Sequence, residues 1–321
     1  MTRARELAEL GAVYDSGALS NRNFVINGAM MIAQRATSVS SQTGSGYKTV
    51  DRIVTNASGS TYNQSQQTVT VGGETGLPTQ FTKFLRHDVT TSNDNAHFYH
   101  KIEGVASVPA GTVTLSFYAK GTTPTGGLAF NAYQNFGTGG SPSGEVSITI
   151  SDTVTLTSTW QRFSINITVP SITGKTLGTN GNDTFYFGIG QFANTSTNAY
   201  QLDITGLQLE VGTEATPFEH RSFGDEVLRC QRYYNEQYYR FEGVFGASGN
   251  GAPHEVSLPV AMRAGPTLSS GTNTKGGDVS SLNSLTNFTG SSLASSVVVN
   301  LNFSGSGNGY IFFNLIADAE L

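Results

Sequence analysis

A long succession of short segments with alternating apolar and polar residues limits the folds open to this chain. Between residues 50 and 211 each segment is bounded by Gly, Pro, Asn or Ser, and no long helical pattern separates one from the next. The predicted strands are 50–56, 64–71, 81–88, 97–103, 112–120, 128–134, 145–150, 153–156, 160–169, 184–191 and 200–211. This pattern predicts an antiparallel β-sandwich of the jelly-roll type, because a parallel α/β sheet would need helices between its strands.

Two of these segments predict the core of the sandwich. In the fifth, Leu115 and Phe117 belong to an apolar set that alternates on one face. In the ninth, the alternation begins only at Phe163, so Trp160 lies either at a bulge or in the preceding turn. Trp160 therefore has two interpretations: a stacking platform for a sugar, or a packing residue at the edge of the domain.

The sequence changes character between residues 200 and 234. Apolar residues alternate as far as Val211, with a turn-prone Thr205-Gly206 pair that predicts a small bulge. Ser222 then precedes two acids, and the residues after them recur at helical spacing, which predicts a short capped linking helix. We therefore expect an N-terminal attachment segment (1–22), a jelly-roll domain (23–221) and a smaller C-terminal β module (222–321).

Several stretches of this sequence resemble fibre and receptor-binding proteins of tailed bacteriophages. They are NRNFVINGAMMIAQRATS, the TVDRI that contains Asp51, the run from LQLEVG through ATPFEHR to CQRYY, and the chain end FNLIADAEL. The resemblance extends in order from Asn21 to the C-terminus, and its shared residues have the character of framework. It implies that the upstream domain is similar to jelly-roll carbohydrate-binding modules and that the protein is a homotrimer on the virion.

The N-terminal residues predict a short helix with Leu7, Leu10 and Tyr14 along one stripe. Because so short a helix is marginal alone in water, the stripe needs a partner. It either lies on its own domain, or forms a three-fold bundle, or docks onto other virion proteins. After this helix we expect a strand covered on both faces over 23–35 and a Ser-, Thr- and Gly-rich loop over 36–48.

The C-terminal module begins with another alternating segment after the predicted helix. Tyr239 and Phe241 share one face of it, while Tyr238, Arg240 and Glu242 share the other. In all, seven short strands are expected over the last hundred residues, separated by long runs of Ser, Thr, Asn and Gly. Such a module has little core of its own, so we expect contacts within a trimer to complete it.

Composition excludes several kinds of partner. The chain has 321 residues, enough for two domains, and only 13% of them are charged. The net charge is −5, with no basic run after the first few residues, so nucleic acid is not expected as a partner. Cys230 is the only cysteine, which excludes a disulfide framework. No apolar run is long enough to insert into a membrane, and no signal peptide is expected, so we expect synthesis in the host cytoplasm and release by lysis as part of a virion.

No arrangement of residues in the sequence predicts catalysis. The Gly174-Lys175-Thr176 triplet lacks the rest of a phosphate-binding loop, and neither GxSxG nor HExxH occurs. His97 and His100 fall on opposite faces of one strand, where we expect two solvated imidazoles and no metal. The acids of the first domain are expected to be solvated. We therefore predict no enzyme activity, no cofactor and no metal.

Aromatic and amide side chains on the strands favour sugar binding instead, because a pyranose needs an aromatic face and surrounding hydrogen-bonding groups. The candidate ligand-binding residues are Tyr99, Tyr118, Asn131, Tyr133, Gln134, Tyr186, Tyr238 and Arg240. The predicted function is attachment of the virion to a host by multivalent binding of surface glycan. The alternatives are a structural decoration or fibre that binds no glycan and, third, a polysaccharide depolymerase.

Overall fold

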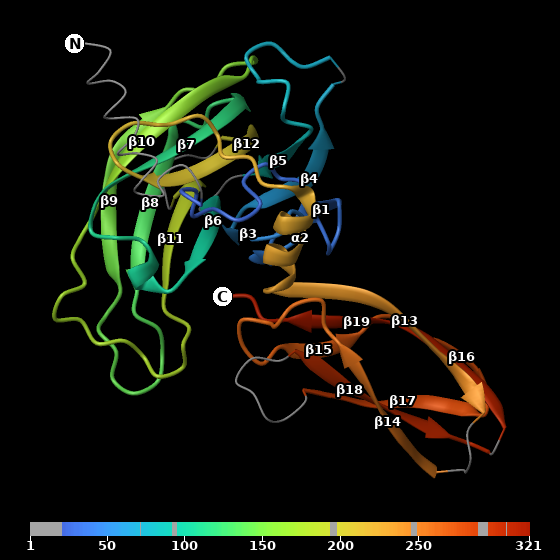
Figure 1. Ribbon diagram of the computed structural model, residues 1–321. Helices are drawn as coiled ribbons and strands as arrows, with labels where there is room; N and C mark the ends of the chain where they lie inside the picture. The colour runs from blue at the N-terminus through green and yellow to red at the C-terminus, as the bar shows by residue number, and fades with distance from the viewer. Residues whose placement is uncertain are drawn as a thin grey trace, which may run out of the picture. The chain divides into compact units, whose positions relative to one another are not determined.

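The computed structural model describes residues 21–70, 72–91, 95–192, 198–244, 249–287, 295–305 and 307–321. Its contacts divide the chain into two compact units, Met1–Arg221 and Ser222–Leu321, each shown in Figure 1. The predicted N-terminal helix, with Leu7, Leu10 and Tyr14, lies outside the described residues. Within the described part, no helix combines the length and the apolar character needed to cross a membrane.

The first unit consists of two six-stranded antiparallel sheets. One, here called the β12 sheet, has the strand order β1-β4-β5-β12-β7-β10, and the other, the β11 sheet, has the order β2-β3-β6-β11-β8-β9. The strands are β1 (Ser38–Gln42), β2 (Gly46–Tyr47), β3 (Ile53–Ser58), β4 (Thr61–Thr68), β5 (Lys83–Thr91), β6 (Asn95–Glu103), β7 (Gly111–Gly121), β8 (Leu128–Asn135), β9 (Val146–Val154), β10 (Gln161–Val169), β11 (Thr184–Gln191) and β12 (Tyr200–Val211). A 3₁₀ turn, η1 (Val105–Ser107), precedes β7.

One apolar core lies between these sheets. Leu115 and Phe117 of β7 point into it from one sheet, and Phe130 and Phe187 point into it from the other. The rings of Phe117 and Phe130 lie 5.8 Å apart, centroid to centroid. The prediction of an all-β, jelly-roll sandwich is thus confirmed. The sheets pack face to face because alternation with a period of two gives each strand one apolar face to bury.

The segment 23–35 is not a strand, contrary to the sequence prediction. Asn27 and Met30 adopt left-handed backbone conformations, with φ of 62° and 58°. The Asn27 amide also binds the backbone: its Nδ2 donates to Ile32 O at 2.9 Å and its Oδ1 accepts from Ile32 N at 3.0 Å. Local turns closed by a side chain therefore replace the strand, which the apolar run alone did not reveal.

Two other boundaries differ from the prediction. The segment 36–48, expected to be a loop, contains the edge strands β1 and β2, one on each sheet. The segments 145–150 and 153–156 form one strand, β9, whose pairing with β8 shifts register between Ala129 and Asn131. In both segments the strand forms because it pairs with a neighbouring strand. The local sequence does not show which segments will pair.

A second apolar cluster covers the outer face of the β12 sheet. It contains Phe81, Phe84 and Trp160, and the Trp160 and Phe84 rings meet edge to face at 5.3 Å. Trp160 is 3% exposed, and its Nε1 donates to Glu74 Oε2 at 2.7 Å. Trp160 is therefore a packing residue, which was one of its two predicted roles. It does not offer a ring face to a sugar, which was the other.

The motifs that carry the phage-fibre resemblance contact one another in the first unit. Glu219 accepts hydrogen bonds from the backbone nitrogens of Asn21, at 2.5 Å, and Asn23, at 2.8 Å. Arg221 Nη1 donates to Val25 O at 2.8 Å. These residues join the segment before β1 to the segment after β12, so their role in the chain is structural.

The second unit begins with helix α2 (Phe223–Gln231), where the Ser222 side chain accepts a hydrogen bond from Asp225 N, as predicted. Its described strands are β13 (Tyr234–Val244), β14 (Gly249–Ser257), β15 (Thr267–Ser270), β16 (Thr274–Gly277), β17 (Val279–Asn287), β18 (Ser296–Phe303) and β19 (Asn308–Asp318). One sheet has the order β13-β19-β15, with β16 also paired to β19, and the other has the order β14-β18-β17. Val299 and Phe313, from the two sheets, share a small core.

Candidate functional site

Five aromatic rings form a continuous row on the outer face of the β11 sheet. They belong to β6, to β8 and to β11 with the residue after it, strands that lie side by side (Figure 1). This aromatic row consists of Phe192, His97, Tyr99, Tyr186 and Tyr133. Phe98, Phe187 and Ala132 point into the core. Because side chains alternate along a strand, the residues next to them in the sequence point to the outer face. Tyr186 is paired directly with Tyr133 in the sheet register.

Successive rings in the row are in contact. The centroid distances are 4.2 Å for Phe192 to His97 and 4.6 Å for His97 to Tyr99. From Tyr99 to Tyr186 the distance is 5.1 Å, with the rings perpendicular, and from Tyr186 to Tyr133 it is 4.7 Å, with the rings nearly parallel. Such contacts hold each ring in one orientation, so the row is a preformed surface.

Glycine on β11 makes this arrangement possible. A Cβ atom at Gly188 would lie 2.4 Å from Asn131 Oδ1 and 2.7 Å from the Tyr99 ring. The Tyr99 and Asn131 side chains therefore lie across the bare backbone of β11 between them. Any larger residue at position 188 would displace both side chains.

Polar groups border the row at the Tyr133 and Tyr186 end. The Tyr186 hydroxyl donates to Glu145 Oε2 at 2.8 Å, and Asn135 Nδ2 donates to the same oxygen at 2.8 Å. Asn131 Nδ2 donates to the Tyr133 hydroxyl at 2.9 Å. The three tyrosine side chains are partly exposed, so solvent or a ligand reaches the rings and the hydroxyls together.

The rings of Tyr99, Tyr186 and His97 are uncharged at neutral pH. Burial, helped by the Tyr133 hydroxyl, raises the pKa of Tyr99 to about 12. Burial and the hydrogen bond to Glu145 raise the pKa of Tyr186 far above its ordinary value. Burial lowers the pKa of His97 to about 4, although its bond to the Gln191 carbonyl opposes the change. The row thus presents apolar ring surface with neutral hydroxyl and amide groups.

Four of the predicted ligand-binding residues meet in this row or beside it: Tyr99, Asn131, Tyr133 and Tyr186. Gln134 is 1% exposed and its Nε2 donates to Pro170 O, because neighbouring residues of a strand point to opposite faces. Gln134, one of the candidate ligand-binding residues, therefore does not lie on the surface that carries Tyr133.

Tyr118 also lies apart from the row. It is on β7, in the opposite sheet, where its ring packs 5.3 Å from that of Phe81. Its strand alternates like those of the β11 sheet, so only the pairing of the strands separates it from the other tyrosines.

Sequence reasoning missed three members of the site: His97, Phe192 and Glu145. His97 shares the period-two position of Tyr99, and this signal was sufficient to place it on the same face. Phe192 follows the end of β11, where alternation gives no indication of its position. Glu145 begins the predicted strand 145–150 but lies just before β9 in the structure, so the pattern did not place it beside Tyr186.

Tyr238 and Arg240 lie in the second unit, on the outer face of β13. The Arg240 guanidinium lies over the ring of Phe312, 5.1 Å from its centroid. The Tyr238 ring lies 6.3 Å from that of Phe312, with an angle of 29° between the rings. These two candidates therefore belong to a separate surface.

The described residues contain no group of three His, Cys, Asp or Glu side chains that could hold a metal ion. His97 faces Tyr99 and His100 faces Phe187, on opposite sides of β6 as predicted. Both imidazoles are buried, so the expectation that they are solvated was wrong. Asp203 is buried too, where it accepts two hydrogen bonds of 2.7 Å from Arg86.

Comparisons with known proteins add likenesses of fold. No protein-family model matches the sequence, and no curated protein matches it. Among solved structures, the enzymatically active domain of bacteriophage CBA120 tailspike protein 4 aligns with 59% of this chain at 15% identity and a TM-score of 0.34, but this chain covers only 21% of that one. The CBM22-1 xylan-binding domain of Paenibacillus barcinonensis Xyn10C aligns with 56% of this chain and 94% of its own, at 14% identity and a TM-score of 0.31. A family 30 carbohydrate binding module aligns with 60% of this chain and 96% of its own, at 14% identity and a TM-score of 0.28.

Proposed function

We propose that the first unit binds carbohydrate along the aromatic row. One observation carries the proposal: the side chains of Tyr99, Tyr133 and Tyr186, from three adjacent strands, meet on the outer face of the β11 sheet. A pyranose ring has an apolar C–H face that packs on aromatic rings and a rim of hydroxyls that exchange hydrogen bonds with amides and carboxylates. Asn131 and Glu145 stand where that rim would lie.

The charge of the surface supports a neutral or weakly polar ligand. The Tyr99 and Tyr186 hydroxyls are protonated at neutral pH, so each both donates and accepts hydrogen bonds. Glu145 is the carboxylate that touches the row, through the Tyr186 hydroxyl. Sugar hydroxyls are suitable partners for such a set, since they too donate and accept.

Substitution of Tyr186 tests this proposal. Tyr186→Ala removes the ring that contacts both Tyr99 and Tyr133, and we expect at least about a tenfold loss of affinity for any glycan the intact protein binds. Affinity is measured by titrating the full chain with the oligosaccharides that give signals on an array of bacterial surface glycans. Tyr186→Phe keeps the ring and removes the hydroxyl, so its affinity should fall by less.

Leu177→Ala serves as the control, because Leu177 is an exposed apolar residue outside the row. Its affinity should equal that of the unsubstituted protein. Glycan binding that survives Tyr186→Ala in a folded protein would place the site elsewhere, and a protein that binds no glycan would refute the proposal.

The finer proposal is that the protein is a bacteriophage virion fibre that attaches the particle to its host. The phage-fibre resemblance of the sequence supports it. The protein would be a homotrimer made in the host cytoplasm and released by lysis, with Leu7, Leu10 and Tyr14 docking on other virion proteins. Three linked copies raise the effective concentration of each site, so weak single-site affinities multiply.

A structural fibre or decoration that binds no glycan is the second candidate. The parallel Tyr133–Tyr186 pair favours it, because cross-strand aromatic pairs also stabilise a sheet by about 0.2–1 kcal/mol. Under this alternative, Tyr186→Ala lowers the melting temperature and the array of host glycans stays silent.

We propose no catalytic step for either role. The depolymerase alternative has a direct assay, the release of reducing sugar from host polysaccharide by the intact protein. Reducing ends that accumulate with time would establish that activity.

A further inference from the structure

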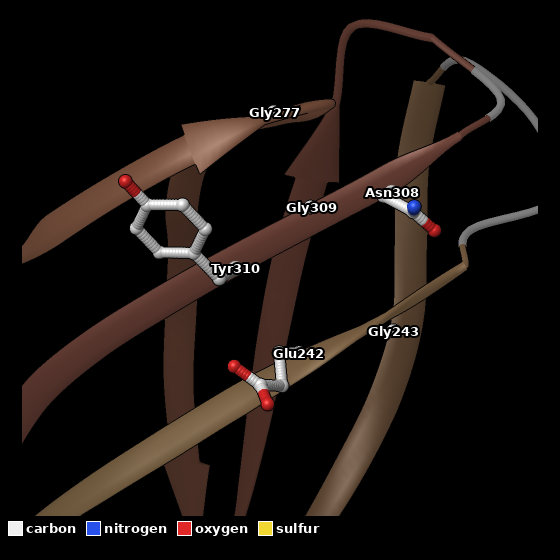
Figure 2. Close-up of a pocket in the computed structure, with 6 residues that line it drawn as sticks. All are labelled: Glu242, Gly243, Gly277, Asn308, Gly309 and Tyr310. Atoms are coloured by element: carbon white, nitrogen blue, oxygen red, sulfur yellow. The ribbon is translucent and has the colours of Figure 1, made fainter.

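The second unit has a pocket at one end of its β13-β19 sheet (Figure 2). The pocket has a volume of about 540 Å³. Its described lining residues are Glu242, Gly243, Gly277, Asn308, Gly309 and Tyr310. This volume lies in the range of about 300–1,000 Å³ that is usual for sites of small molecules. The combination of an aromatic ring, a carboxylate, an amide and exposed peptide groups is one that a polyhydroxylated ligand can satisfy.

The sheet register places these groups together. Glu242 of β13 and Gly276 of β16 are both paired with Tyr310 of β19, so the three positions form one row across the strands. A Cβ atom at Gly276 would lie 2.7 Å from atoms of the Tyr310 ring, so this ring lies against the bare backbone of β16. Figure 2 shows Tyr310 and Glu242 on neighbouring strands beside the pocket.

The backbone of the pocket is held in a conformation that favours glycine. Gly277 has a φ of 64°, and a Cβ atom there would lie 2.1 Å from Asn308 O. Gly243 is paired with Gly309, which in turn is paired with Gly277. A Cβ atom at Gly309 would lie 2.9 Å from Val279 Cγ2, so side chains at this level would point into the core, and only peptide groups of the sheet line the pocket here.

Neighbouring side chains hold Glu242 and Tyr310 in place. Arg240 Nε donates to Glu242 Oε2 at 2.8 Å, and its guanidinium lies over the Phe312 ring. Both bonds from Arg240 end on Oε2, so Oε1 faces outward from this ion pair and can accept a ligand hydroxyl. The Tyr310 ring is stacked on that of Phe312, with centroids 5.0 Å apart and an angle of 21° between the rings.

We propose that this pocket is a second carbohydrate-binding site, which takes one neutral sugar ring. The Tyr310 ring packs on the C–H face of the sugar, while Glu242 Oε1 and the Asn308 amide bind its hydroxyls. Because Arg240 balances the charge of Glu242, this pair carries no net charge, which suits a neutral ligand. A metal ion would need more ligands than the single carboxylate among the described lining residues. The site is independent of the aromatic row, because none of its residues belongs to the first unit.

The experiment uses the full chain with Tyr186→Ala, which disables the aromatic row, and the methyl glycosides of glucose, galactose and mannose as probes. Saturation-transfer NMR detects which probe binds, and titration gives its affinity. We expect one of the three to bind. Adding Tyr310→Ala should weaken that binding at least about tenfold, and adding Glu242→Gln, which keeps the shape of the side chain, about tenfold.

Two further variants separate positioning from loss of fold. Gly276→Ala displaces the Tyr310 ring without changing the lining residues, and we expect weaker binding with an unchanged melting temperature of the second unit. Leu228→Ala, at a residue of α2 that is 46% exposed and does not line the pocket, should leave the affinity unchanged.

The outcomes for the two sites are distinguishable. If none of the three glycosides binds, or if Tyr310→Ala and Glu242→Gln leave binding unaltered, the second site does not exist. Binding of a methyl glycoside that is lost with Tyr310→Ala supports the second site whatever happens at the aromatic row, because the row is tested separately by the loss of oligosaccharide binding in Tyr186→Ala alone.

Discussion

At the residue scale, His87 is the most unusual side chain of the first unit. It points from β5 into the apolar core, is 0% exposed, and packs 5.2 Å from the Tyr62 ring, centroid to centroid. Neither ring nitrogen has a hydrogen-bond partner in the part of the chain that the structure describes. Burial lowers the pKa of His87 to about 3 from its ordinary value of 6.5. The core therefore holds a neutral imidazole. Its two ring nitrogens have lost their hydrogen bonds to water without gaining others, which lowers the stability of the folded unit.

This burial predicts that acid destabilises the first unit. As pH falls below 6.5, the unfolded chain binds a proton at His87 while the folded unit does not until about pH 3, so the free energy of unfolding decreases. Between about pH 7 and about pH 5, His87 alone should contribute a loss of roughly 2 kcal/mol. His97 and His100 act in the same direction, because burial lowers both of their pKa values.

Urea unfolding at the two pH values measures the loss, with the fluorescence of Trp160, the only tryptophan, as a reporter for the first unit. His87→Leu removes the titrating group and keeps an apolar side chain of similar size. Its stability should therefore depend less on pH, by roughly 2 kcal/mol over the same interval. An equal pH dependence in both proteins would contradict the prediction.

At the scale of one element, β12 organises the β12 sheet. It pairs with β5 on one side and with β7 on the other, and its pairing with β7 shifts register between Thr205 and Gln208. Gly206 lies in this bulge with a φ of 64°. A Cβ atom there would lie 2.7 Å from the Phe81 ring. The bulge thus needs glycine for its backbone conformation and also for the space that Phe81 occupies.

Gly206→Ala should lower the free energy of unfolding of the first unit by about 1–3 kcal/mol more than Gly212→Ala does. Gly212 is a matched control, because its φ is also positive, at 117°, but no atom lies within 4 Å of the place that a Cβ atom would take there. Both substitutions force alanine into a backbone conformation with positive φ. Only Gly206→Ala also places a Cβ atom against the Phe81 ring. Urea unfolding followed through Trp160 measures the difference, and equal losses would show that Phe81 moves aside freely.

At the scale of the whole molecule, the two units differ in how much core they have. The sandwich of the first unit buries a large cluster that draws on both of its sheets, whereas the second unit buries a much smaller set around Val299 and Phe313. Its outer face also carries exposed aromatic residues, Tyr238 and Tyr310. A small module of this kind gains stability when copies associate.

Sedimentation of the full chain tests the proposed homotrimer. We expect a species of three times the chain mass of 34.0 kDa, with an unfolding midpoint that rises with protein concentration. A stable, folded monomer at 34.0 kDa would contradict the proposal. Glycan binding by each unit can then be measured on whichever species is present.

Much of this architecture follows from the sequence alone. The strands at 184–191 and 200–211 and the cap at Ser222 lie where alternation and capping chemistry predict them, because both signals are local. The two faces of β13 also follow from period two, with Tyr239 and Phe241 packed on the core. Local pattern determined which residues of a strand share a face.

Only the tertiary structure decided which strands are neighbours, and hence which residues meet. Tyr118 and Tyr133 have equivalent patterns, but β7 and β8 belong to different sheets, so one ring is packed against Phe81 and the other lies in the aromatic row. The turns at 23–35 depend on Asn27 and on backbone hydrogen bonds to β12, where Leu207 N donates to Gly28 O and Leu209 O accepts from Phe24 N. Strand pairing joins residues far apart in the chain, and periodicity within one segment carries no information about its partner.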